Sequence, residues 1–123
     1  MDNSSKYWGY HLMLDCSSCN FNKITDPTHI KNFLAKLIPS IGMTAFGEPM
    51  IEMLLAGDEN EGYSVLQLIT TSNITAHFVN RNCSAYIDVF SCKKFEIDLV
   101  LEITKEFFEY QSIKHQFIIR NAD

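Results

Sequence analysis

Two kinds of hydrophobic spacing occur along the chain, and each predicts its own kind of secondary structure. Short apolar or alternating runs rich in β-branched and aromatic side chains are typical of strands. The segments that we expect to be strands are 7–16, 63–70, 74–79, 85–92 and 115–120. The first of these is largely apolar on both faces, so we expect it in the interior of a sheet.

Two other segments repeat their apolar residues every three or four positions, as one face of a helix does. The first follows Asp26-Pro27, a capping residue and a proline suited to the first helical turn, and it ends near residues 39–42. The second covers residues 96–110. Residues 43–55 are apolar but contain Gly47 and Pro49, which predicts short extended pieces or a bent edge strand.

The order of these elements predicts one domain over residues 1–123, of class α+β. We expect a two-layer α/β sandwich with a mostly antiparallel sheet and two main helices on one face. A sheet with helices on only one side leaves its other face uncovered. The pattern therefore predicts a homodimer.

The composition supports this picture and excludes some partners. With 123 residues, 46% of them hydrophobic, the chain is long enough for one core. A net charge of −5 argues against nucleic acid or an anionic membrane as the main partner. Residues 1–6 lack the order of a signal peptide, and no stretch reaches the roughly 20 apolar residues of a membrane span, so we expect a cytoplasmic location.

The spacing of the four cysteines does not favour a disulfide framework or a metal site. In the cytoplasm we expect free thiols rather than disulfides. Cys16 and Cys19 have the spacing of half a zinc site, but Cys83 and Cys92 are nine residues apart and do not form a second close pair. We therefore expect no metal.

The densest polar cluster within the expected strands is residues 70–77, with Asp88 and Cys92 on the next strand. If these strands pair as a hairpin around residues 80–84, hydroxyls, an imidazole and a thiol come together. Ser, Thr and Asn are also common in turns, and His77 and Cys92 also suit a packed core. The pattern alone leaves both interpretations open.

The cluster reads T-S-N-I-T-A-H over residues 71–77 and D-V-F-S-C over residues 88–92. This resembles the small prokaryotic-type S-adenosylmethionine decarboxylase family, with its motif E-S-H-x-S-I-H-T-x-P-E and a later D-[IV]-F-[ST]-C. Ser72, His77 and Cys92 fall in register with the family's serine, histidine and cysteine. Residues 9–15, G-Y-H-L-M-L-D, resemble the family's first strand, G-x-H-L-[LIV]-x-[ED], so the likeness covers nearly the whole chain.

The resemblance implies a chain that cleaves itself between residues 71 and 72 into fragments 1–71 and 72–123. Ser72 would attack the carbonyl of Thr71, with His77 as the base for the elimination that follows. Ser72 would become a pyruvoyl cofactor, whose ketone forms a Schiff base with the substrate amine and takes up electrons when CO2 leaves. Cys92 would return a proton to the α-carbon.

Further site residues are implied less directly. Ser64 matches a serine that assists processing in the family, and Asp15 matches an acidic position near its active site. Asp88 is a candidate anchor for the site by hydrogen bonding. An aromatic residue is needed to stack on adenine, and Phe46 or Phe78 is available.

The departures from the motif concern mainly the substrate. Val79 and Arg81 stand where the family has an aromatic residue and a glutamate, and neither stacks on adenine or accepts a hydrogen bond from ribose. Thr71 and Asn73 replace the glutamate and the histidine that flank the serine. Three hypotheses follow: an S-adenosylmethionine decarboxylase of spermidine synthesis, a pyruvoyl-dependent ornithine or arginine decarboxylase, and a non-processing homologue that binds a ligand or a partner.

Overall fold

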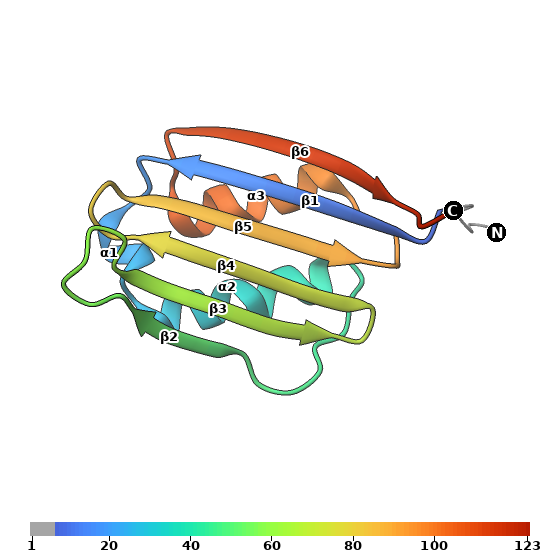
Figure 1. Ribbon diagram of the computed structural model, residues 1–123, viewed down its shortest axis with the longest axis horizontal. Coiled ribbons are helices and arrows are strands. Elements are labelled where there is room, and N and C mark those ends of the chain that lie inside the picture. The colour runs from blue at the N-terminus through green and yellow to red at the C-terminus, as the bar shows by residue number, and fades with distance from the viewer. Residues whose placement is uncertain (1–6) are drawn as a thin grey trace.

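The computed structural model describes residues 7–123 and consists of one antiparallel sheet with helices on one side (Figure 1). The expectation about a signal peptide concerns residues 1–6, which lie outside the described residues. The strands are β1 (Gly9–Ser17), β2 (Met50–Leu54), β3 (Gly62–Ile69), β4 (Ser72–Val79), β5 (Ser84–Ser91) and β6 (Ser112–Arg120). Their spatial order is β2-β3-β4-β5-β1-β6, so β1 lies in the interior of the sheet, as expected.

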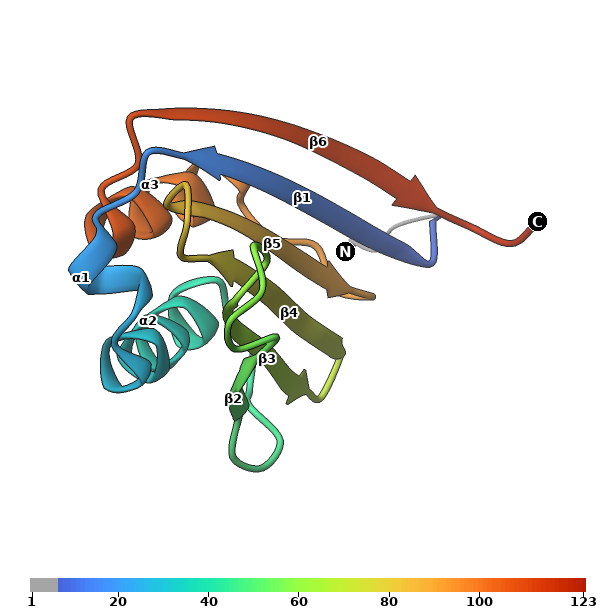
Figure 2. The same cartoon turned by 60° about the vertical axis from the view of Figure 1, so that its left-hand side comes forward.

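The helices are α1 (Phe21–Ile24), α2 (Pro27–Ser40) and α3 (Ile97–Phe108). Figure 2 shows that all of them lie on the same side of the sheet. The predicted α+β sandwich is confirmed. The short α1 was not foreseen, because its single turn lies in a polar loop that has no helical repeat of apolar residues.

The ends of α2 follow from local chemistry. The Asp26 carboxylate accepts hydrogen bonds from the backbone N–H groups of Thr28 and His29, at 3.0 and 3.2 Å, which satisfies two donors of the first turn. At the other end Gly42 adopts a φ of 75°, and the Met43 N–H donates to the Ile38 carbonyl at 2.9 Å. The expected start and end of this helix are therefore confirmed.

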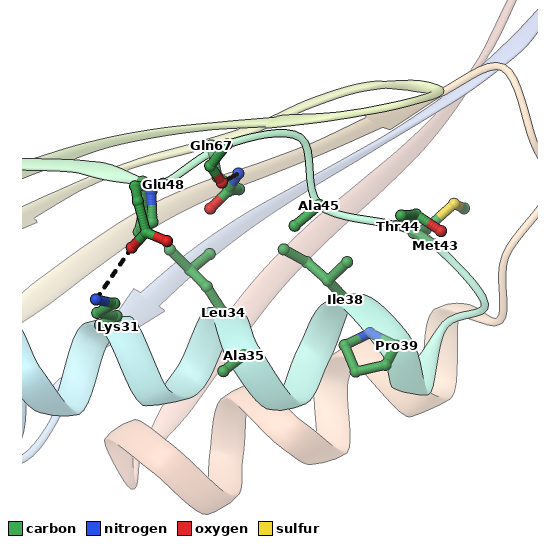
Figure 3. A pocket seen from close by; sticks show the side chains of 12 residues that line it. Lys31, Leu34, Ala35, Ile38, Pro39, Met43, Thr44, Ala45, Glu48 and Gln67 are labelled. Atoms are coloured by element: carbon green, nitrogen blue, oxygen red, sulfur yellow. Dashed lines mark hydrogen bonds and ion pairs between the residues drawn. The ribbon is translucent and has the colours of Figure 1, made fainter.

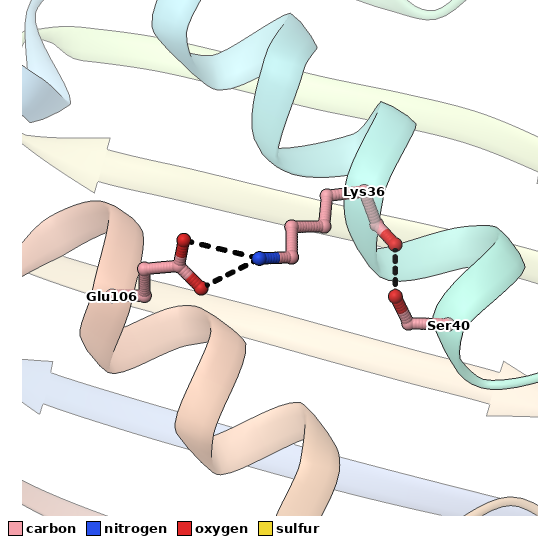
Figure 4. A network of polar contacts seen from close by, with 3 residues as sticks. All are labelled: Lys36, Ser40 and Glu106. Carbon is pink, nitrogen blue, oxygen red and sulfur yellow. Dashed lines mark hydrogen bonds and ion pairs between the residues drawn. The ribbon is translucent and has the colours of Figure 1, made fainter.

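The core lies between the sheet and the two longer helices. Alternate residues of the central strands point toward the helices and are completely buried, including Leu12, Ile74 and Val89. From the helix side, Phe33 and Phe108 meet with ring centroids 4.8 Å apart. At the surface Lys36 of α2 binds the Glu106 carboxylate of α3 through contacts of 3.0 and 3.1 Å (Figure 4), an exposed pair of the kind that contributes about 0–1 kcal/mol.

The other face of the sheet carries no helix in the part of the chain that the structure describes, and we call it the open face. It carries exposed large apolar side chains on four of the strands: Met50, Leu54, Leu66, Leu68, Tyr86 and Ile118. Between residues 7 and 123 no helix has the length and apolar character needed to cross a membrane.

Candidate functional site

The first group of candidate residues lies where β4 begins, and we call Thr71, Ser72, Asn73 and Cys92 the Ser72 end. Ser72 has a φ of 155°, a value that L-amino acids rarely adopt. The backbone N–H of Cys92 donates to the Thr71 carbonyl oxygen at 2.9 Å. The Asn73 carboxamide donates to the Ser72 hydroxyl oxygen at 3.1 Å. An N–H donor directed at a carbonyl oxygen stabilises negative charge there, so the bond between residues 71 and 72 is polarised for attack.

The side chain of Thr71 is held from the buried side of the sheet. Its hydroxyl accepts a hydrogen bond from Ser91, which is completely buried, at 2.7 Å and lies 3.3 Å from the sulfur of Met43. Ser91 in turn accepts the backbone N–H of Lys93 at 3.0 Å. These contacts fix Thr71 through its side chain. The Cys92 side chain is exposed.

The second group is the pair of Ser64 on β3 and His77 on β4, which we call the His77 pair. The register places the two residues opposite each other, and the Ser64 hydroxyl lies 2.7 Å from His77 Nδ1. The other ring nitrogen, Nε2, lies 3.0 Å from the Asn60 carbonyl oxygen. A carbonyl oxygen only accepts hydrogen bonds, so Nε2 carries the proton and Nδ1 of the neutral ring accepts from Ser64.

These two groups do not meet within one chain. Ser72 and His77 are five residues apart on one strand, which corresponds to roughly 16 Å at about 3.3 Å per residue. The expected hairpin of β4 and β5 is confirmed, but it pairs Ser72 with Ser91 and His77 with Tyr86. The imidazole is therefore far along the strand from the Cys92 thiol, contrary to the expectation that the hairpin brings them together.

The two acidic candidates lie within strands rather than at their ends. Asp88 binds His11 Nε2 at 2.9 Å across β5 and β1, with both side chains partly exposed. Asp15 is exposed and pairs with Tyr86, which pairs with His77, so the three residues form one row across the sheet. Asp15 is thus two strands away from His77, and no contact joins it to the Ser72 end.

The two aromatic candidates have opposite environments. Phe46 precedes β2 and is 65% exposed. Phe78 is completely buried, with its ring centroid 5.0 Å from that of Phe108. The expectation that Phe78 is available to stack on a ligand is therefore wrong, because the alternation along β4 directs it under α3.

Cys16 and Cys19 are both buried at the end of β1. Burial raises the pKa of Cys16 to about 12 and that of Cys19 to about 11, with neighbouring thiols adding to the effect. Such thiols are almost entirely protonated at neutral pH and are poor nucleophiles. Among residues 7–123 no three His, Cys, Asp or Glu side chains are arranged to hold a metal ion.

A cavity of about 400 Å³ lies between α2 and the segment 43–49 (Figure 3). Its wall is mainly apolar and includes the buried amide of Gln67, and Lys31 pairs with Glu48 at 3.1 Å beside it. Two of its lining residues contact candidate residues: the Met43 sulfur contacts Thr71, and the Gln67 amide donates to the Phe46 carbonyl at 3.4 Å. Ser72, Cys92 and His77 do not line this cavity.

Sequence reasoning missed the backbone groups that complete both arrangements. The Asn60 carbonyl and the Cys92 amide have no signature in the sequence, because every residue carries the same backbone. The buried Ser91 was also missed, although its place in the strand motif next to Cys92 was a usable signal.

Known proteins resemble this chain in sequence and in fold. Residues 10–121 match the profile of the family described as S-adenosylmethionine decarboxylase. The S-adenosylmethionine decarboxylase proenzymes of Clostridium botulinum strains Loch Maree and 657 are each 27% identical over 116 residues, which is 94% of this chain and 96% of each relative. The crystal structure of the adenosylmethionine decarboxylase from Aquifex aeolicus VF5 superimposes with a TM-score of 0.80 and 17% identity, over 97% of this chain and 95% of that one. This last likeness shows the fold.

Proposed function

Because the chain belongs to the S-adenosylmethionine decarboxylase family, we propose that it is a pyruvoyl-dependent S-adenosylmethionine decarboxylase that cleaves itself between Thr71 and Ser72. In this role it acts in the cytoplasm and supplies the aminopropyl donor for spermidine synthesis. The observation that carries the proposal is the hydrogen bond of 2.9 Å from the Cys92 amide to the Thr71 carbonyl, beside a serine with a φ of 155°.

The self-cleavage is an attack by the Ser72 hydroxyl on the Thr71 carbonyl carbon. The C–N bond breaks while the nitrogen takes up a proton, which leaves an ester. Removal of the Ser72 Cα proton then expels the Thr71 carboxylate, and hydrolysis releases ammonia and leaves the pyruvoyl group on the second fragment. The Cys92 amide stabilises the charge on the carbonyl oxygen during the attack. The unusual φ of Ser72 stores strain of about 1–3 kcal/mol next to the bond that breaks.

The residues present suit the cofactor and its reaction. The Asn73 carboxamide holds the Ser72 oxygen that would make the attack and then leave within the Thr71 carboxylate, while the ketone of the pyruvoyl group would form at the Ser72 Cα. When formed, that group supplies the electron-accepting ketone needed for loss of CO2. Cys92 follows Ser91, the residue paired with Ser72, and its exposed thiol is the proposed proton donor to the product.

We propose that the complete site forms between two copies of the chain. Ser72 and Cys92 would come from one protomer, and Ser64 and His77 from its partner. This follows from the separation of about 16 Å along β4, which leaves His77 out of reach of Ser72 within one chain. The exposed apolar side chains of the open face support the same homodimer, since patches of this kind usually mark interfaces.

A second candidate function keeps the cofactor and changes the substrate to ornithine or arginine. The substitutions at Val79 and Arg81 favour it. Val79 is buried, and the Arg81 guanidinium donates to the Glu59 carbonyl at 3.2 Å, so neither takes the place of the family's adenosine contacts. Glu52, opposite Ser64 in the register, offers a carboxylate for the distal cation of such a substrate.

The intact mass of the purified chain, measured under denaturing conditions beside Ser72→Ala, tests the self-cleavage. We expect two fragments that divide between residues 71 and 72, a blocked second fragment, and an uncut variant. CO2 release from S-adenosylmethionine, ornithine and arginine then identifies the substrate. A single full-length mass after prolonged incubation would contradict self-processing and favour the non-processing homologue.

A further inference from the structure

The turn between β2 and β3 is fixed by more interactions than a surface connection needs. Leu55 and Gly57 both adopt left-handed conformations, with φ of 56° and 87°. Within the turn the Asp58 N–H donates to the Leu55 carbonyl at 2.9 Å, and the Asp58 carboxylate accepts the Asn60 N–H at 2.8 Å. A non-glycine residue in the left-handed region costs about 1–3 kcal/mol, so such a turn persists only where its surroundings determine it.

Glu61 forms hydrogen bonds both within this turn and to Asn80, in the connection between β4 and β5. One oxygen of its carboxylate accepts the Gly57 N–H at 2.9 Å, and the other accepts the Asn80 side-chain amide at 3.0 Å. The backbone N–H of Asn80 also donates to the Glu61 carbonyl at 2.9 Å. The two bonds to the carboxylate, the one from Gly57 first and then the one from the Asn80 side chain, hold the pKa of Glu61 below its usual value, so the carboxylate is ionised near neutral pH.

The contact of the Asn80 side chain with Glu61 has a cost in free energy. Its side-chain oxygen is buried and accepts no hydrogen bond within the described chain. A buried acceptor without a partner typically costs about 1–3 kcal/mol. Residues that carry such costs often serve a function, and here the side chain that meets Asn80 is that of Glu61.

The turn contacts His77 through a backbone group: the Asn60 carbonyl oxygen lies 3.0 Å from His77 Nε2. In the neutral imidazole this carbonyl selects the tautomer with its proton on Nε2. The only basic nitrogen, Nδ1, then faces the Ser64 hydroxyl at 2.7 Å. Both ring nitrogens are therefore hydrogen-bonded, and the group next to the basic nitrogen is the Ser64 hydroxyl.

We propose that the turn 55–61 is part of the processing machinery. Its Asn60 carbonyl orients His77, and Glu61 is the positioning residue that holds the turn. Ser64 contacts the reacting atoms and relays the proton to His77. This inference rests on the proposed self-cleavage. In the relay the Ser64 oxygen takes the proton from Ser72 of the partner while its own proton passes to Nδ1, which leaves an imidazolium held by Asn60. The imidazolium then gives that proton back through Ser64 to the Ser72 nitrogen as the C–N bond breaks, so no further reagent is consumed.

The kinetic test compares cleavage rates of full-length variants by intact mass over time. Glu61→Ala should slow cleavage about tenfold, the loss expected when charge-assisted hydrogen bonds that hold the turn are removed. Glu59→Ala is the matched control, because the Glu59 carboxylate, in the same turn, makes no hydrogen bond or ion pair within residues 7–123, and its rate should not change. Equal slowing by both variants would overturn the role of Glu61.

A double-mutant comparison tests the relay through Ser64. If His77 acts only through Ser64, the variant Ser64→Ala/His77→Ala cleaves no more slowly than Ser64→Ala alone. Ser64→Thr, which keeps the hydroxyl, should retain more activity than Ser64→Ala. Independent effects that multiply in the double variant would show that His77 contacts the reacting atoms directly, and would overturn the relay.

A spectroscopic readout separates this inference from the proposed function. In ¹⁵N-labelled, uncut Ser72→Ala at about pH 8, His77 should show an Nε2–H proton protected from exchange with water and an unprotonated Nδ1. Adding Glu61→Ala should remove this protection, and adding Glu59→Ala should not. If the wild-type chain never cleaves but this pattern is present, the positioning by the turn stands while the proposed function fails. An unprotected Nε2–H in Ser72→Ala would overturn the positioning itself.

Discussion

The Ser72 end and the His77 pair lie on the same strand but are built in different ways. At the Ser72 end the decisive groups belong to the backbone: the Thr71 carbonyl, the Cys92 amide and the φ of 155° at Ser72. At the His77 pair a hydroxyl and an imidazole meet at 2.7 Å, and the imidazole is held from its other side by the turn.

The difference bears on the departures of this chain from the family motif. A backbone arrangement survives a change of side chain as long as the strand keeps its register. Thr71 and Asn73, which replace a glutamate and a histidine, leave the Cys92 amide on the Thr71 carbonyl. The His77 pair depends on its side chains, and there Ser64 and His77 match the family. The two regions should therefore respond differently to substitution.

The largest effect is expected at His77. His77→Ala removes the imidazole that is hydrogen-bonded to Ser64, and general acid–base groups contribute about 10²- to 10⁴-fold, so cleavage should slow by that factor. The time course of cleavage by intact mass measures it. Thr75→Ala, on the same strand and two residues away, is the control and should cleave normally. Normal cleavage by His77→Ala would mean that the pair has no part in processing.

Cys92→Ala sharpens the comparison, because it removes a side chain and keeps the backbone amide that meets Thr71. Cleavage should continue within about threefold of the wild-type rate, while CO2 release from the mature enzyme falls about 10²-fold through loss of the proton donor. Mass spectrometry and CO2 release, measured on the same sample, separate the two effects. If cleavage stops as well, the thiol, and not the amide alone, takes part in processing.

Asn73→Ala should have a smaller effect. Its carboxamide donates to the Ser72 oxygen at 3.1 Å, and a single hydrogen bond of this kind contributes about 0.5–1.5 kcal/mol. We expect cleavage to slow about two- to tenfold, with the same two fragments formed. A complete block would show that Asn73 does more than orient the hydroxyl.

The smallest effect concerns the pH dependence of stability at Glu61. Its pKa is lowered by the Gly57 and Asn80 hydrogen bonds, so its stabilisation is present above the usual glutamate pKa and is lost as the pH falls through the lowered value. In the uncut Ser72→Ala chain, Glu61→Gln should therefore lower Tm near neutral pH, and the difference should shrink below about pH 4.5. A difference in Tm that does not depend on pH would contradict the role of the carboxylate.

The fold was largely predictable because its signals are local. The alternation in 7–16 and the Asp26-Pro27 cap each depend on neighbouring residues, and they predicted β1 and the start of α2. The motif supplied the candidate site residues, but their arrangement was not predictable. The spacing of five between Ser72 and His77 suggests proximity only if the chain turns between them. Once Ser72 is the first residue of β4, the same spacing separates the two by roughly 16 Å.

The composite site between two protomers is the central claim, and a mixture of two inactive variants tests it most directly. Ser72→Ala lacks the nucleophile and His77→Ala lacks the base, so neither homodimer should show cleavage during the time in which the wild-type chain is fully cleaved. In a mixed dimer prepared by co-expression or by unfolding and refolding together, the His77→Ala chain keeps Ser72 and receives His77 from its partner. We predict that the His77→Ala chain is then cleaved between residues 71 and 72 and that the Ser72→Ala chain stays intact. A mixed dimer in which both chains stay at full length would contradict the account.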